Sequence, residues 1–154
     1  MKTLTPLIIS TLISGISCTT PAPVVSELGI NSSTIRLGFE RDGRFIPKTD
    51  KSFFNSDKII LKFKANGLAV KNGQVKVNID LFLKKDNNIL GAENDIWGKD
   101  GLSETVTGTS VESDLELGII PPSETKGEII ANLTLKDLNS TAKFVSFQTS
   151  FILK

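Results

Sequence analysis

Residues 74–84 read QVKVNIDLFLK, and their hydrophobic side chains recur at every second position. The recurring set is Val75, Val77, Ile79, Leu81 and Leu83. A period of two places alternate side chains on opposite faces of a β-strand, whereas a helical face repeats every 3.6 residues. This stretch therefore predicts a strand with one face in a hydrophobic core.

The same alternation appears on both sides of this stretch, in 35–39, 59–65, 111–119, 128–136 and 143–153. Turn-forming pairs separate the runs, among them Asp42-Gly43, Asn66-Gly67, Asn72-Gly73 and Asp100-Gly101. This pattern predicts an all-β fold, a single antiparallel two-sheet immunoglobulin-like sandwich of about seven strands over residues 34–154. We expect one core between the sheets, formed by Ile59, Leu61, Phe63, Val75, Val77, Ile79, Leu81, Leu117, Leu133, Phe147 and Phe151.

The first residues have the pattern of an export leader. Lys2 precedes an apolar stretch from Leu4 to Ile16. A membrane-spanning helix needs about 20 apolar residues, so this shorter stretch predicts a signal peptide over residues 1–17.

The single cysteine, Cys18, directly follows this leader. Residues 14–18 (SGISC) resemble the lipobox of bacterial lipoproteins, although Gly15 stands where Leu is common. We expect lipidation of Cys18 and a flexible tether over residues 18–33. The alternative is an ordinary leader cleaved near Ser17 or Thr20, with Cys18 discarded or left as a free thiol.

Composition excludes several classes of function. The chain has no His, a single Cys and a net charge of +1. A Ser-His-Asp triad, a Cys-His pair and a thiolate zinc site are therefore impossible within one chain. We expect no cofactor, and the balanced charge gives no basic field for nucleic acid.

Two groups of acidic residues could still carry chemistry. Glu112, Asp114 and Glu116 lie on the outward face of one expected strand, where two carboxylates could serve a carboxylate-dependent hydrolase. A solvated, charged sheet face is the interpretation that we favour, so we expect no catalytic residue.

The second group lies between residues 86 and 100. Its carboxylates and amides offer oxygen atoms of the kind that calcium prefers. The EF-hand spacing fails at Leu90, and Asp and Asn are common in turns. We expect no metal site, while the sequence leaves open whether the loop 87–103 binds calcium.

A family resemblance rests on features at the strand ends. Phe53-Phe54 precedes Asp57, a strand runs from Ile59 to Gly67, and the chain closes with Phe151-Ile152-Leu153. In these respects residues 53–154 resemble the immunoglobulin-like domains of small bacterial lipoproteins and cell-envelope proteins. The resemblance implies a sandwich in an envelope setting, without an active site that could be transferred.

Three outward positions are apolar where polar residues are expected. In an immunoglobulin-like order the strands 74–84, 128–136 and 143–153 are neighbours, which brings Phe82, Ile130 and Ile152 together at one end of the outer face. Either the loop 87–103 folds over them, or they bind a partner protein weakly.

These observations predict a non-catalytic, lipid-anchored cell-envelope protein that acts as a binding or spacing module. The alternative is an accessory lipoprotein of a secretion or assembly complex. The expected partners are the membrane, through the lipid anchor, and another envelope protein. Thr19 stands where some lipoproteins of the inner membrane carry Asp, so we expect an exported protein of the outer membrane.

Overall fold

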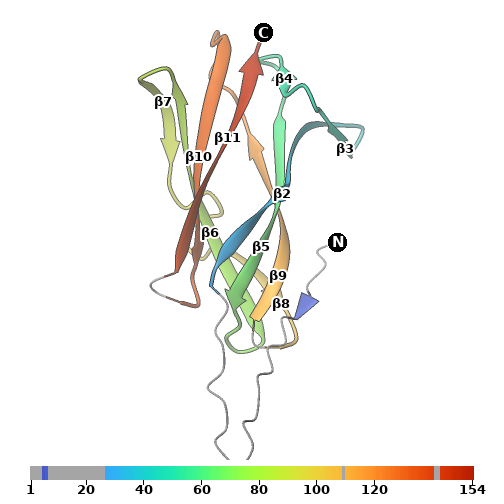
Figure 1. Cartoon of the computed structure of the whole chain (residues 1–154), viewed down its shortest axis with the longest axis vertical. Coiled ribbons are helices and arrows are strands. Elements are labelled where there is room, and N and C mark those ends of the chain that lie inside the picture. Colours follow the sequence, from blue (N-terminus) through green and yellow to red (C-terminus); the bar gives the residue numbers. More distant parts are fainter. Residues whose placement is uncertain (1–4, 7–26, 109, 141–142) are drawn as a thin grey trace, which may run out of the picture.

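The computed structural model describes residues 5–6, 27–108, 110–140 and 143–154, and every regular element in this part of the chain is a β-strand (Figure 1). The strands are β1 (Thr5–Pro6), β2 (Gly29–Arg41), β3 (Arg44–Pro47), β4 (Ser52–Phe53), β5 (Ile59–Ala69), β6 (Gln74–Lys85), β7 (Asn88–Glu93), β8 (Leu102–Thr105), β9 (Ser110–Ile119), β10 (Gly127–Asp137) and β11 (Phe144–Leu153). The expected all-β class is confirmed.

The strands form two sheets that pack together. Sheet A has the order β1-β9-β5-β2-β3, and sheet B the order β4-β11-β10-β6-β7, with β8 also paired to β6. All pairings are antiparallel except that of β4 with β11. The expected adjacency of 74–84, 128–136 and 143–153 is confirmed, because β6, β10 and β11 lie side by side.

The core lies between the sheets and follows the alternation in the sequence. Ten of the eleven expected core residues are buried, and Phe147 is half-buried against the core. The ring of Phe147 lies 4.9 Å from that of Phe63, centroid to centroid, so the two sheets touch there. The register predicted from the hydrophobic period is therefore correct.

Two of the expected turns have the geometry that their residues favour. Asp42 and Gly43 have φ values of 52° and 71°, and Asn72 and Gly73 have 52° and 71°. Positive φ at both central positions belongs to the tight hairpin turn that Asn-Gly and Asp-Gly form most readily.

The expected tether is too long at its C-terminal end. Strand β2 begins at Gly29, and Gly29, Ile30 and Asn31 pair with β5 before the register shifts. At the shift, Thr34 Oγ1 accepts the backbone N–H of Lys64 at 2.9 Å, so a side chain replaces the missing backbone acceptor. Polar residues thus extend the strand where the sequence suggested a linker.

Three other expectations fail locally. Asn66-Gly67 is a bulge and not a turn, because β5 continues to Ala69 while Gly67 adopts a φ of 73°. A Cβ atom at Gly67 would collide with the carbonyl oxygen of Glu27. The segment 87–103 is not one loop, since β7 and β8 both pair with β6. The described chain therefore exceeds seven strands, although only six of them have ten residues or more.

A buried carboxylate connects the two sheets at one end. Asp137 is only 3% exposed and accepts the backbone N–H groups of Ala69 at 2.8 Å and Asn139 at 3.0 Å. The amide of Asn139 donates to the carbonyl oxygens of Ala69 at 3.0 Å and Gln74 at 2.7 Å. The ends of β5 and β10 and the start of β6 are thereby fixed to one another.

Candidate functional site

The structure brings Phe82, Ile130 and Ile152 together on the outer face of sheet B. Phe82 lies opposite Asn132, Ile130 opposite Lys84 and Ser150, and Ile152 opposite Glu128. Each apolar residue is therefore offset by two positions from the next, a diagonal spacing of about 7–8 Å that aromatic and long side chains can bridge. We call Phe82, Ile130 and Ile152 the outer cluster.

The outer cluster remains partly open to solvent. Phe82 and Ile130 are half-buried, and Ile152 is 45% exposed. The expected alternative, in which the loop 87–103 folds over these residues, is wrong. Strand β7 continues the sheet at the edge of β6, and Ala92 lies beside Phe82 in register. Backbone pairing along β6 thus keeps β7 in the plane of the sheet and leaves the cluster uncovered by it.

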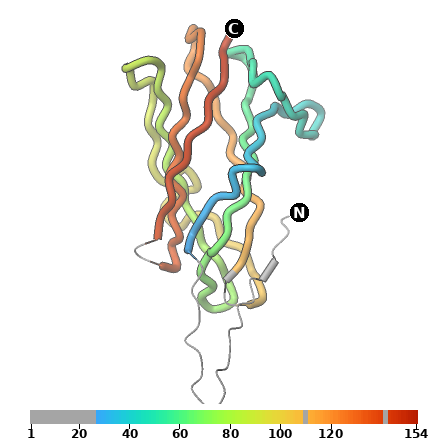
Figure 2. The backbone as a smooth tube through the Cα atoms, viewed as in Figure 1, coloured from blue at the N-terminus to red at the C-terminus, as the bar shows by residue number. Residues whose placement is uncertain are grey.

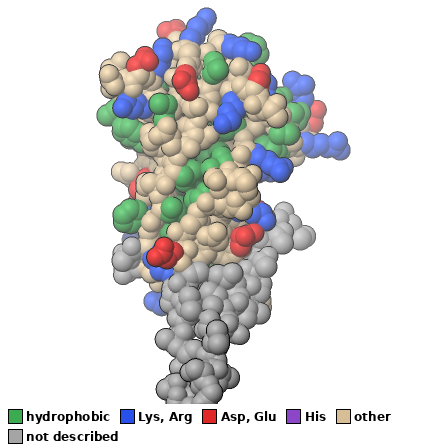
Figure 3. Space-filling view, in the orientation of Figure 1, with side chains coloured by type: hydrophobic (Ala, Val, Ile, Leu, Met, Phe, Trp, Pro, Cys, Tyr) green, Lys and Arg blue, Asp and Glu red, His purple; other side chains and the backbone are tan. Residues whose placement is uncertain are grey.

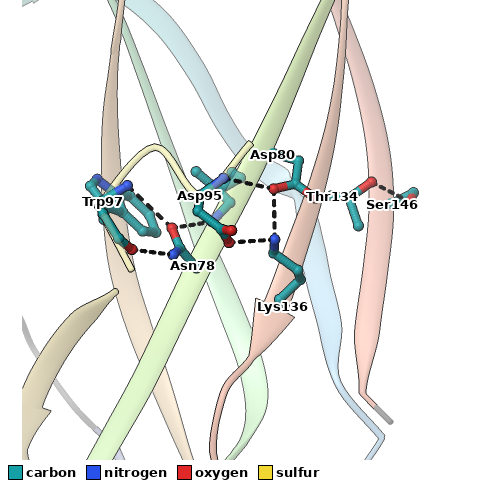
Figure 4. A network of polar contacts seen from close by, with 9 residues as sticks. Asn78, Asp80, Asp95, Trp97, Thr134, Lys136 and Ser146 are labelled. Atoms are coloured by element: carbon teal, nitrogen blue, oxygen red, sulfur yellow. Dashed lines mark hydrogen bonds and ion pairs between the residues drawn. The ribbon is translucent and has the colours of Figure 1, made fainter. Parts of the chain in front are cut away.

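The segment after β7 closes over a different part of the face, around Asn78. The backbone N–H of Trp97 donates to Asn78 Oδ1 at 3.2 Å, and Asn78 Nδ2 donates to the carbonyl oxygen of Gly98 at 2.6 Å (Figure 4). The N–H of Ile96 donates to the carbonyl oxygen of Ile79 at 3.0 Å. Asn78 is fully buried by this arrangement.

An ion-pair group fixes the same segment. Lys136 Nζ lies 2.7 Å from Asp80 Oδ1 and 2.6 Å from Asp95 Oδ1, and the Asp95 N–H donates to Asp80 Oδ1 at 2.9 Å (Figure 4). Partial burial acts to raise the pKa of Asp80, but the bonds from Lys136 and Asp95 outweigh it and lower that pKa. Burial likewise opposes the charge of Lys136, yet its two carboxylate partners raise its pKa. We call Asp80, Asp95 and Lys136 the charged latch.

Sequence reasoning did not find the charged latch. Asp80 and Lys136 point outward from the neighbouring strands β6 and β10 and lie diagonally across from each other. Only the register between these two strands shows that the two side chains meet. Asp95 depends on the path of an irregular segment, for which the sequence carries no periodic pattern.

The three carboxylates of β9 lie on the outer face of sheet A, as expected, and each faces a lysine of β5. Lys64 Nζ lies 2.9 Å from Glu112 Oε1 and 3.8 Å from Asp114 Oδ1, and Lys62 Nζ lies 2.9 Å from Glu116 Oε2. The hydrogen bond to Glu112, followed by the charge of Asp114, raises the pKa of Lys64. This pairing supports the interpretation as a charged sheet face.

Metal binding finds no support in the described ranges. No group of three or more His, Cys, Asp or Glu side chains there could hold a metal ion. Within the candidate calcium segment, Asp86 occupies the turn between β6 and β7 with a φ of 52°, and Asp95 belongs to the charged latch. These two residues thus have structural roles.

The expected leader and Cys18 fall almost entirely outside the described residues, of which Thr5–Pro6 are the first. No helix in the described part of the chain is long and apolar enough to cross a membrane. Figure 3 shows basic and acidic side chains interspersed over the described part of one face.

A comparison of the chain with protein-family models and with curated proteins found no match.

Proposed function

We propose that the protein is a non-catalytic, lipid-anchored cell-envelope protein whose immunoglobulin-like sandwich acts as a binding or spacing module. The leader and the lipobox-like SGISC sequence support the anchor at Cys18. The adjacency of β6, β10 and β11 in one antiparallel sheet supports the immunoglobulin-like order. The parallel pairing of β4 with β11 is a local addition at the edge of that sheet.

The position of the outer cluster carries the binding role. Strand β2 starts at one end of the sandwich. The β6–β7 turn and the final residues of β11 lie at the opposite end (Figure 2). Phe82, Ile130 and Ile152 belong to this far end, because they pair close to those last two features. A lipid on Cys18 would thus place the cluster away from the bilayer, where it can meet another protein.

The alternative, an accessory lipoprotein of a secretion or assembly complex, is favoured by the same position. A spacing module needs no apolar surface at its free end, whereas docking on a larger complex does. The outer cluster is small, so we expect contact through a few side chains and not through a broad interface.

The test is crosslinking in intact cells that express the full chain, followed by mass spectrometry of the captured proteins. Phe82→Ser should abolish specific capture, because it replaces the aromatic ring of the cluster with a small hydroxyl-bearing side chain. Phe144→Ser is the matched control, since Phe144 lies on the outer face of the same sheet at its other end and is 68% exposed. Equal capture by the two variants would contradict the docking role.

A further inference from the structure

Among the described residues, one edge of strand β9 has no partner over most of its length. One edge of β9 pairs with β5 from Ser110 to Ile119. At the opposite edge, β1 pairs with Val111 and Glu112. From Ser113 to Ile119, no strand in the described ranges occupies this opposite edge. Unpaired backbone N–H and C=O groups of such an edge are a template for another extended chain.

The pairing with β1, which belongs to the expected leader, shows that the edge accepts an extended segment. Thr5 lies opposite Glu112 and Pro6 opposite Val111, in antiparallel orientation. Two described residues form this contact. Because this pairing is antiparallel, the ladder would extend toward Ile119 through residues on the N-terminal side of such a segment.

On the outer face of sheet A, this edge is acidic. Glu112, Asp114 and Glu116 alternate along β9, and their side chains are 34%, 43% and 53% exposed. Lys62 and Lys64 of β5 pair with these three carboxylates, and Arg36 lines the same groove. The acidic side chains therefore lie on the edge strand itself, and the basic side chains lie behind it. Basic side chains on an added strand would lie directly opposite them.

Toward the core, the same edge borders an apolar opening between the sheets. A cavity of about 300 Å³ lies at the end of β9 nearest Ile119, with Leu81 and Leu83 from β6 and Ile96 and Pro122 from the connecting segments in its wall. Side chains that point inward from an added strand would enter this space. Burial of an aliphatic side chain there would strengthen binding, because it removes apolar surface from water.

We propose that the free edge of β9 binds an extended segment of a partner chain in which basic and apolar residues alternate. The basic residues would face Asp114 and Glu116, and the apolar residues would fill the opening between the sheets. A second copy of β9 is a poor occupant, because antiparallel self-pairing would set acidic side chains against each other. This inference concerns sheet A and does not depend on the outer cluster or on the anchor.

A synthetic peptide tests the proposal on the full chain kept in detergent. The probe is the capped heptapeptide KVKIKVK, with EVEIEVE and the proline-containing KVKPKVK as controls. Trp97, the single tryptophan, lines a groove together with Asp114 and Glu116 and so reports on the edge by its fluorescence. We expect a saturable fluorescence change with the basic peptide and none with either control, because one has the wrong charge and the other cannot form the ladder.

Charge-reversal variants locate the binding site. Glu116→Lys should weaken binding of the basic peptide about tenfold, since an attraction becomes a repulsion. Glu128→Lys, a charge reversal on the outer face of sheet B, should leave binding unchanged. Binding should also slow hydrogen exchange of the amides between Ser113 and Ile119, a readout that does not require any variant to fold. Equal responses to the three peptides, equal weakening by both variants, or unchanged exchange in β9 would each overturn the proposal.

Discussion

At the scale of single residues, Asp137 combines a structural role with an electrostatic cost. Its two oxygens accept backbone N–H groups that would otherwise be buried without partners. Burial nevertheless raises the pKa of this carboxyl above its usual value, more than these bonds lower it. Because the folded-state pKa is raised, the stability that the protonated Asp137 side chain contributes is complete below the unfolded-state pKa. This stability is lost as the pH rises through the folded-state pKa.

Removal of this side chain should destabilise the protein in a pH-dependent way. Asp137→Ala leaves the N–H of Ala69 without its acceptor, and we expect a loss of about 1–3 kcal/mol in the free energy of unfolding by urea titration. The gap to the parent should widen as the pH falls toward 3.8, the ordinary pKa of an aspartate. Asp100→Ala, at an exposed position, should change stability by less than about 0.5 kcal/mol. A gap that narrows toward acid would contradict this account.

Phe63 allows a direct test of the core. Its side chain is 2% exposed and contacts Phe147 of the opposite sheet. Phe63→Ala should cost about 3–5 kcal/mol, because it leaves a cavity between the sheets. Phe144→Ala, at a residue that is 68% exposed, serves as the control and should cost less than about 0.5 kcal/mol. The measurement is thermal or urea unfolding, and a small loss for Phe63→Ala would mean that the core can close around the deletion.

At the scale of elements, the charged latch and the Asn78 bonds determine where the segment after β7 lies. Asp95 is held by Lys136 and Asp80, and the next residues are held by Asn78 and the backbone of β6. This segment therefore covers the middle of the β6 face, whereas Phe82 at the far end is half-buried. The charged latch and the Asn78 bonds thus hold this segment away from Phe82 and leave that apolar side chain accessible to a partner.

The latch predicts a specific dependence of stability on acid. The pKa of Asp80 is lowered, so its stabilising contribution is present above the ordinary aspartate pKa of 3.8 and is lost as the pH falls through its lower folded-state pKa. Asp80→Asn should lower stability at pH 7 and make the decline below pH 3.8 shallower than in the parent. Lys136→Met should flatten the same decline, because it removes the partner. Unfolding by urea at a series of pH values measures both, and an unchanged slope in both variants would contradict the assignment.

The sequence was informative where one physical pattern dominates. Alternation gave the six long strands and the register of the core, because burial of one face fixes a period of two. It failed where pairing depends on a partner strand, as in Gly29–Asn31 and Asn88–Glu93, whose backbones are ordered by β5 and β6. For the outer cluster, the sequence predicted which residues meet, while the path of the covering segment depended on Asp95.

At the scale of the whole molecule, the proposed anchor at Cys18 predicts where the protein is found in the cell. Cys18→Ala should release the protein from the detergent-extracted membrane fraction, or leave it unprocessed, because the acylated residue is missing. Fractionation and the mass of the mature N-terminus measure this. An intact, unmodified Cys18 in the mature parent protein would show that the anchor is absent, and Ser17→Ala, which keeps a small residue before the cysteine, should behave like the parent.

The place of β11 in the sheet has a consequence for how the chain reaches its final state. β11 is synthesised after every other described strand, yet it lies between β4 and β10 and supplies Phe151 and Leu153 to the core. Neither the inner layer of sheet B nor the parallel contact with β4 can be completed until this strand has been synthesised. Closure of the sandwich around Phe151 and Leu153 is consequently a late event, which cannot precede the synthesis of nearly all of the described chain.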